Sequence, residues 1–141
     1  MMKSNINIEY IGLVGKKMAQ EASVPVALHL DHGQSYEYCL TALRHGFSSV
    51  MIDASVKSLK ENNAITKKVV AACKHLGISV EAELGYVGEG STYDNDSDDS
   101  YKTLPEEVKK FVAKTDVDAL QSLSAMPMVL TKRLLRLTME D

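Results

Sequence analysis

The 141-residue sequence lacks any long run of apolar side chains. No stretch approaches the roughly 18 consecutive apolar residues that a membrane-spanning helix needs. The first ten residues, MMKSNINIEY, also lack the charged-then-apolar layout of a signal peptide. We therefore expect no membrane partner and a cytoplasmic location.

Cysteine and excess positive charge are scarce as well. The only two cysteines, Cys39 and Cys73, lie far apart and form no CxxC pair. This favours two buried thiols in a reducing compartment over a disulfide. The net charge of -3 and the scattered lysines and arginines give no electrostatic reason to expect a nucleic-acid partner. With 45% hydrophobic and 25% charged residues, the composition is typical of a globular domain.

Helical and strand patterns alternate along the chain. The expected helices cover residues 8–22, 35–45, 58–76 and 105–114, and the expected strands cover 24–30, 48–53, 78–84 and 116–120. The strand at 24–30 is apolar almost throughout, which predicts a position inside a parallel sheet. Residues 85–100 contain three glycines and a run of Asp, Asn and Ser, which predicts a long loop. The alternation indicates an α/β fold built from βαβ units, and four strands do not close into a barrel.

Polar side chains stand where three of these strands end. They are Asp31 with His32, then Asp53, then Glu83. The carboxyl ends of parallel strands meet at one edge of a sheet, where α/β proteins place their active sites. Each residue alone has a plainer interpretation, since a histidine at a strand end is often structural and Asp53 could cap the next helix. Their coincidence at one edge favours a metal or acid–base site.

Three segments carry a resemblance to a known family. VPVALHLDHG (24–33), GFSSVMIDAS (46–55) and SVEAELGYVG (79–88) resemble segments of the class II, zinc-dependent fructose-bisphosphate and tagatose-bisphosphate aldolases, in the same order and spacing. These enzymes are TIM (β/α)8 barrels, which need about 250 residues. The resemblance covers about residues 8–120 and implies that residues 1–120 form a partial barrel, roughly its third to sixth strands.

The resemblance also implies roles for individual residues. His32 corresponds to a ligand of the catalytic Zn2+, and Asp31 to the acid–base group that moves the proton of the substrate hydroxyl. Asp53 and Glu83 correspond to carboxylates of a second or alternate cation position, for a divalent or monovalent ion. His29 is either structural or a neighbour of the site. The loop after Glu83 either closes over substrate or is a solvated linker, and its Glu89 is a weak candidate for proton transfer.

The chemistry of an aldolase fits these roles. Reversible aldol cleavage leaves an enediolate, whose charge a zinc ion with open coordination positions stabilises as a Lewis acid. A carboxylate within reach of the hydroxyl proton supplies general base catalysis. The implied partner is a small-molecule sugar bisphosphate, and the full-length family is expected to be homo-oligomeric. We favour fructose 1,6-bisphosphate, cleaved to dihydroxyacetone phosphate and glyceraldehyde 3-phosphate in glycolysis, over tagatose bisphosphate.

The resemblance breaks after Leu120. The family supplies two further zinc-ligating histidines from later strands, the first in a strand of the type AVSIGNAHG, whereas residues 121–129 read QSLSAMPMV. The residues MPMV are encoded by ATG CCN ATG GTN. Read one base earlier, these codons give four residues: one of Asn, Asp, His or Tyr, then Ala, then again one of Asn, Asp, His or Tyr, and finally Gly. Asn-Ala-His-Gly fits that pattern. We therefore interpret residues 121–141 as an out-of-frame tail, with a genuine amphipathic helix over LTKRLLRLTM (130–139) as the alternative.

Three interpretations of function remain open. The first is a zinc-dependent aldolase, and the second is an inactive, non-enzymatic remnant, because half a barrel leaves unpaired strand edges and uncovered apolar faces. The third is complementation by a separately encoded second half that carries the missing histidines. Zinc content and cleavage of fructose 1,6-bisphosphate distinguish the first two.

Overall fold

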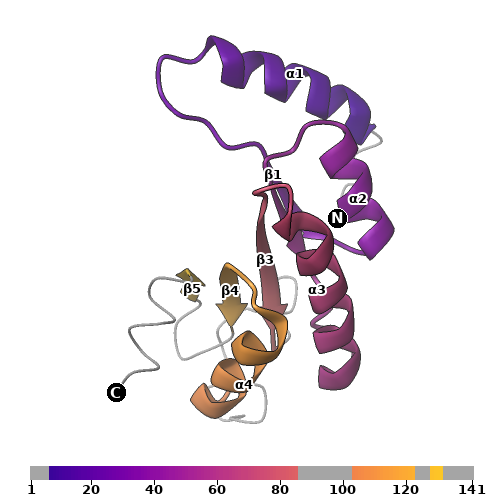
Figure 1. The fold of residues 1–141 in the computed structure, drawn as a ribbon, viewed down its shortest axis with the longest axis vertical. Helices are drawn as coiled ribbons and strands as arrows, with labels where there is room; N and C mark the ends of the chain where they lie inside the picture. The colour runs from indigo at the N-terminus through magenta and orange to yellow at the C-terminus, as the bar shows by residue number, and fades with distance from the viewer. Residues whose placement is uncertain (1–6, 86–102, 123–127, 132–141) are drawn as a thin grey trace, which may run out of the picture.

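Helices and strands alternate through the computed structural model, which describes residues 7–85, 103–122 and 128–131. The order is α1 (Ile8–Glu21), β1 (His29–Gly33), α2 (Tyr36–Arg44), β2 (Ser49–Ile52), α3 (Leu59–Lys74), β3 (Ser79–Leu84), α4 (Pro105–Thr115), β4 (Ala119–Ser122) and β5 (Met128–Thr131) (Figure 1). All four expected helices and all four expected strands are present. The loop expected over residues 85–100, with Glu89, lies almost wholly outside the described residues.

The strands form one sheet in the order β1-β2-β3-β4-β5. The first three pairings are parallel, as expected, whereas β5 runs antiparallel to β4. In the described part of the chain the sheet is open and β1 lies at one edge, whereas the sequence predicts a strand inside a sheet. At the other edge β5 covers β4. Leu130 and Thr131, the first described residues of the alternative helix at 130–139, belong to this strand instead.

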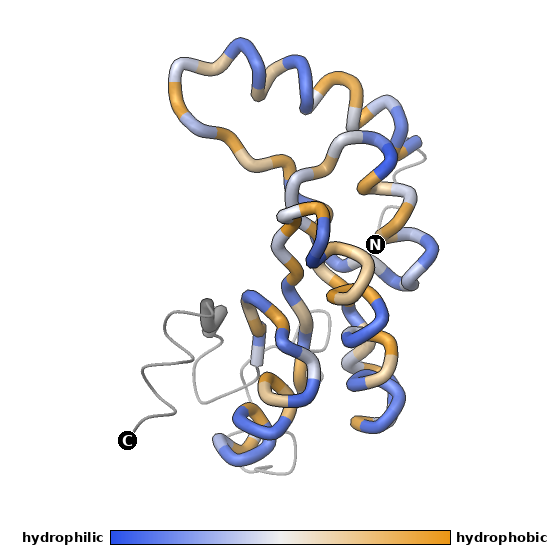
Figure 2. Tube along the Cα trace, viewed as in Figure 1, coloured by the Kyte–Doolittle hydropathy of each residue, from blue (hydrophilic) through white to orange (hydrophobic). Residues whose placement is uncertain are grey.

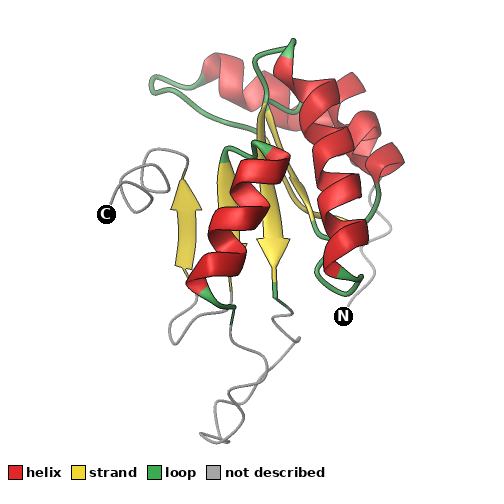
Figure 3. Cartoon of the chain, turned by 60° about the horizontal axis from the view of Figure 1, so that its bottom comes forward, coloured by secondary structure: helices red, strands yellow, loops and turns green. Residues whose placement is uncertain are grey.

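Helices pack against the sheet (Figure 3), and a hydrophobic core lies between them. Alternate strand residues point to one face of a sheet, and the apolar set on this face packs against α2, α3 and α4. Its members include Leu30, Val50, Ile52, Val80, Ala82 and Leu120 from the strands and Cys39, Ala42, Val69, Cys73 and Phe111 from the helices. Both cysteines are fully buried and free, as the sequence predicts. The intervening strand residues face the other way, and several of these are polar.

Two strands begin later than the sequence suggests. The expected strand at 24–30 is β1 at His29–Gly33, and Val24 and Val26 are 63% and 50% exposed. Pairing with β2 begins at His29 opposite Ser49, so the first apolar residues of the run have no strand beside them. The last expected strand begins at Ala119 rather than at residue 116, because Asp116 is the C-cap of α4, with a left-handed φ of 57°.

Helix α1 contacts the rest of the chain through Ile8, which is buried in the core, and through two glycines. A Cβ atom on Gly12 would lie 2.4 Å from the carbonyl oxygen of His45, and one on Gly15 would lie 2.7 Å from Leu28 Cδ1. Hydrophobic and hydrophilic residues alternate along α1 (Figure 2). The exposed large side chains of this helix are Tyr10, Ile11, Leu13, Val14 and Met18. All of these but Leu13 border a groove of about 380 Å³, lined by Tyr10, Ile11, Val14, Gly15 and Met18.

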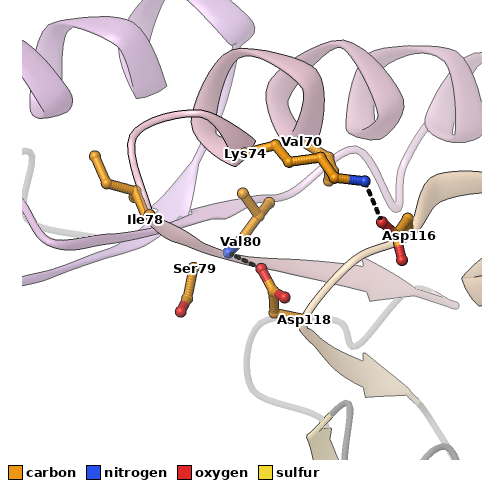
Figure 4. Close-up of a pocket in the computed structure, with 8 residues that line it drawn as sticks. Val70, Lys74, Ile78, Ser79, Val80, Asp116 and Asp118 are labelled. Carbon is orange, nitrogen blue, oxygen red and sulfur yellow. Dashed lines mark hydrogen bonds and ion pairs between the residues drawn. The ribbon is translucent and has the colours of Figure 1, made fainter.

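A second cavity, of about 240 Å³, lies at the amino ends of β3 and β4 (Figure 4). There the Asp118 carboxylate accepts a 3.0 Å hydrogen bond from the backbone N–H of Val80, and Lys74 Nζ lies 3.0 Å from Asp116 Oδ2. These contacts fix the entry of the chain into β3 and β4, at the end of the sheet opposite Asp53 and Glu83. None of the described helices combines the length and apolar character needed to cross a membrane.

Candidate metal centre

All three side chains that are expected to bind metal come together at the carboxyl end of the sheet. They are His32 in β1, Asp53 directly after β2 and Glu83 in β3. One potential ligand atom from each lies within 4.8 Å of the other two. The parallel pairing of the three strands explains this, because it aligns their carboxyl ends.

An irregularity at the end of β1 sets the direction of His32. Leu30 pairs with Val50 and Gly33 with Ile52, so three steps along β1 match two along β2, which is the signature of a bulge with one extra residue. His32 adopts a left-handed φ of 49°, a conformation that costs about 1 kcal/mol or more for a residue with a side chain. The ordinary alternation of side chains is therefore broken where Asp31 and His32 follow one another.

Gly33 makes the close approach of β1 to β2 possible. A Cβ atom at this position would lie 2.5 Å from the Met51 carbonyl oxygen and 2.9 Å from Cys39 Sγ. The Gly33 carbonyl accepts a 2.9 Å hydrogen bond from the backbone N–H of Asp53. The glycine of the LDHG motif thus brings the backbone of Asp53 beside that of His32.

Asp53 is held by a local turn. Its Oδ1 accepts hydrogen bonds from the backbone N–H of Ser55 at 3.0 Å and from the Ser55 hydroxyl at 2.6 Å. The N-cap of α3 is Ser58, in a capping box with Glu61. Asp53 therefore does not cap the following helix, and the turn instead fixes its carboxylate near His32 and Glu83.

Glu83 is the buried member of the group, with 2% exposure. Burial of a carboxylate is costly unless the charge is paired or binds a metal. Its backbone is fixed from α3, because the Asn62 amide donates a 2.8 Å hydrogen bond to the Glu83 carbonyl. One buried carboxylate, one half-buried carboxylate and one exposed imidazole thus border the candidate site.

Asp31 lies next to this group but outside it. Its Oδ1 is 3.7 Å from His32 Nδ1, and its side chain is 79% exposed. The carboxylate therefore stands on the solvent side of the three possible metal ligands. This position is compatible with a group that exchanges a proton with a bound substrate.

His29 has partners of its own. Its Nδ1 lies 2.8 Å from the Ser49 hydroxyl, and its Nε2 lies 3.6 Å from Glu81 Oε2. Burial raises the pKa of Glu81, and the nearby His29 partly opposes this shift. His29 is not part of the three-residue group found in the described residues, and its contacts place it in the polar face of the sheet beside the site.

Sequence reasoning missed three residues around the site. Glu81 precedes Glu83 by two positions, so the period of a strand could have placed both on one face. Asn62 is a polar residue in the interior of α3, and a polar residue on a buried helix face is a usable signal. Met51 lies with its Sδ 3.2 Å from His32 Nδ1, and nothing in the local sequence indicates that contact.

The donor set suits a divalent cation. Imidazole nitrogen and carboxylate oxygen both bind Zn2+, and catalytic zinc sites use about three protein ligands while leaving a position open. Carboxylate oxygens also accept harder cations. His32, Asp53 and Glu83 could therefore hold one ion together or contribute to two neighbouring positions.

Comparisons with known proteins identify the family of the chain. The family model "Fructose-bisphosphate aldolase class-II" matches residues 1–121. The chain is 50% identical over 104 residues to a fructose-bisphosphate aldolase of Thermus caldophilus, covering 73% of this chain and 34% of that protein. It is 42% identical over 111 residues to a fructose-bisphosphate aldolase of Helicobacter pylori, covering 78% and 36%.

A solved structure extends the similarity to the fold. The YdjI aldolase from Escherichia coli K12 superposes with a TM-score of 0.70 at 39% sequence identity, over 82% of this chain and 40% of that one. The fold is thus part of a class II aldolase TIM barrel, and the chain spans about a third of the length of the curated relatives it matches. The chain belongs to the class II fructose-bisphosphate aldolase family of carbon–carbon lyases.

Proposed function

We propose that this chain provides one side of the metal-dependent active site of an aldolase that cleaves fructose 1,6-bisphosphate to dihydroxyacetone phosphate and glyceraldehyde 3-phosphate. The observation that carries the proposal is the meeting of His32, Asp53 and Glu83 within 4.8 Å at the carboxyl end of the sheet. Membership of the aldolase family supports the choice of reaction. The relatives named fructose-bisphosphate aldolases support the choice of sugar over tagatose bisphosphate.

Each residue has a role in this proposal. His32 binds the catalytic ion, and Asp53 and Glu83 bind a cation at a second or alternate position. Zinc, when bound, supplies Lewis-acid stabilisation of the enediolate charge. Asp31, exposed beside His32, takes the proton of the substrate hydroxyl when the carbon–carbon bond breaks and returns it in the reverse direction. The buried surroundings of Glu83 strengthen its attraction for a cation.

Zinc binding by the purified chain tests the metal assignment. We expect His32→Ala, Asp53→Asn and Glu83→Gln each to weaken zinc binding measured by calorimetry at pH 7.5. His75→Ala is the matched control, because His75 is an exposed histidine at the C-cap of α3. Equal zinc affinity in His32→Ala and His75→Ala contradicts the assignment.

A second interpretation is that the chain is an inactive remnant. The open edge at β1 and the exposed apolar side chains of α1 favour it, since an unpaired strand edge and an uncovered apolar face invite association. Cleavage of fructose 1,6-bisphosphate that stops when a chelator is added refutes the remnant interpretation. Zinc binding without cleavage supports a site that needs the missing part of the barrel.

We also propose that residues 121–141 are read out of frame. Support comes from the extent of the family match, which ends at residue 121, where the sequence analysis places the break. Sequencing the gene and its flanks tests this. We expect a single added base near codons 120 and 121 to give Ala-Val-Ser-Ile-Gly-Asn-Ala-His-Gly, and codons that cannot be regrouped in this way contradict the proposal.

A further inference from the structure

The thioether of Met51 contacts the histidine that is the proposed metal ligand. Met51 Sδ lies 3.2 Å from His32 Nδ1. Met51 sits on β2, between β1 and β3, and is only 1% exposed. The sulfur therefore contacts the His32 imidazole from the interior of the protein, on the side that solvent does not reach.

The backbone around Met51 is fixed, so the sulfur has a defined place. The Cys39 thiol donates a 3.7 Å hydrogen bond to the Met51 carbonyl, and the backbone of Gly33 approaches the same carbonyl closely. Met51 also pairs with Glu81 in the parallel register of β2 and β3. A buried side chain on so constrained a strand has few alternative positions.

The chemistry of the two groups selects one form of the imidazole. A neutral imidazole carries a proton on one nitrogen and a lone pair on the other, while a thioether sulfur has lone pairs only. A contact at 3.2 Å is attractive when Nδ1 carries the proton and repulsive when it carries the lone pair. Asp31 Oδ1, 3.7 Å from the same nitrogen, acts in the same direction because a carboxylate also favours a proton there.

We propose that Met51 is a positioning residue that keeps the proton of neutral His32 on Nδ1 and so presents Nε2 to the metal. Metal-binding histidines usually donate their second N–H to a carboxylate, a carbonyl or water, which fixes the tautomer and the ring orientation. Here the buried thioether takes that part. The inference rests on the metal site proposed above, but the tautomer itself exists without metal.

The tautomer can be read directly in the metal-free protein. The 141-residue chain is labelled with 15N-histidine, and long-range 1H–15N correlation spectra are recorded at pH 8, with the His32 signals assigned by their loss in His32→Ala. We expect wild-type His32 to be protonated on Nδ1, and Met51→Leu to give a mixture of both tautomers. A wild-type spectrum with the proton on Nε2 refutes the proposal without any variant.

Zinc affinity supplies the second readout. We expect Met51→Leu to weaken zinc binding about tenfold, the lower end of the effect of removing a group that orients a metal-binding histidine. Ile52→Leu is the matched control, because Ile52 is equally buried on the same strand but faces the helices, and we expect it to leave zinc affinity and tautomer unchanged. In a His32→Ala background, Met51→Leu should change zinc affinity by less than about twofold, since the partner is gone.

The outcomes separate this inference from the proposed function. An unchanged tautomer in folded Met51→Leu, or an equal loss of zinc affinity in the His32→Ala background, overturns the role of Met51 while the metal site stands. If the wild-type chain has the Nδ1 tautomer of His32 but binds no zinc, the proposed metal site is contradicted, while the role of Met51 in setting the tautomer stands. If Met51→Leu does not fold, the tautomer of His32 in Asp31→Ala decides. A proton kept on Nδ1 without the carboxylate supports the role of Met51, and a proton moved to Nε2 overturns it.

Discussion

The side-chain amide of Asn62 donates a 2.8 Å hydrogen bond to the backbone carbonyl of Glu83. Asn62 is 2% exposed, and its Oδ1 accepts a 3.1 Å hydrogen bond from the Thr66 hydroxyl. This chain of bonds connects α3 to the end of β3. The helix thus fixes the position of a strand residue whose carboxylate is a candidate metal ligand.

Replacement of Asn62 by Leu should therefore destabilise the fold and the site together. The change leaves the Glu83 carbonyl and the Thr66 hydroxyl without their buried partner, at about 1–3 kcal/mol for each unsatisfied group. Urea denaturation should show a loss of about 2 kcal/mol or more, with weaker zinc binding. Asn63→Leu is the control, because the Asn63 amide bonds only to a carbonyl of its own helix, and a loss as large as that of Asn62→Leu would contradict the argument.

The grouping of the candidate site residues could be predicted because their signals are local. Asp31, Asp53 and Glu83 each stand where an apolar run stops, and a glycine follows closely after Asp31 and Glu83. The structure places His32, Asp53 and Glu83 together because the strands that carry them are parallel neighbours. The order of elements followed from the same local patterns, since periodicity and turn residues act over a few positions.

The contacts that hold the site were not predictable in the same way. The start of β1 depends on where β2 begins, 20 residues away at Ser49 opposite His29, so the apolar run alone misplaced it. The 3.2 Å contact between Met51 and His32 joins two strands. The start of a strand and the contacts between strands depend on pairing and packing with distant segments, so the pattern within one segment does not predict them.

Gly33 offers a test of the close packing between β1 and β2. In Gly33→Ala the new methyl carbon meets the Met51 carbonyl oxygen at 2.5 Å, so β1 must shift, and overpacking of this kind costs about 1–3 kcal/mol. We expect Gly33→Ala to unfold at a lower temperature than the wild type and to bind zinc more weakly. Gly77→Ala is the control: its φ of 66° makes a side chain strained, but no atom lies within 4 Å of the new carbon. The zinc affinity of Gly77→Ala should stay at the wild-type value. An equal decrease of zinc affinity in both variants would contradict the argument, because the loss would then not come from the packing of β1 against β2.

Variants of Asp118 and Lys74 compare how much a partly buried hydrogen bond and an exposed ion pair stabilise the fold. Both interactions lie at the end of the sheet opposite the candidate metal site. Asp118→Ala removes the acceptor of the Val80 N–H, which lies on a residue 1% exposed. We expect a loss of about 1–3 kcal/mol in unfolding free energy from the unpaired donor. Lys74→Ala removes only the exposed partner of Asp116, worth about 1 kcal/mol or less. Zinc binding should be unchanged in both, and the ranking fails if Lys74→Ala proves the more destabilising in denaturant titrations.

Cys39 predicts a loss of stability at alkaline pH. Burial, and then the neighbouring Cys73, raise the pKa of the Cys39 thiol from 9.0 to about 11. The unfolded chain therefore releases this proton near pH 9, whereas the folded chain retains it to about pH 11. The unfolding free energy contributed by the thiol is fully present below pH 9 and is lost as the pH rises through 11.

The comparison of wild type with Cys39→Ala isolates this contribution, because lysines and the second cysteine titrate in both. Over the interval from pH 9 to pH 11 we expect the unfolding free energy of the wild type to fall by up to about 2 kcal/mol more than that of the variant. Cys39 should also react slowly with a thiol reagent at pH 8 in the native protein and quickly in urea, since it has no solvent exposure. Parallel pH profiles for the two proteins, together with fast native labelling, would mean that the Cys39 side chain is accessible and that β1 and β2 do not cover it.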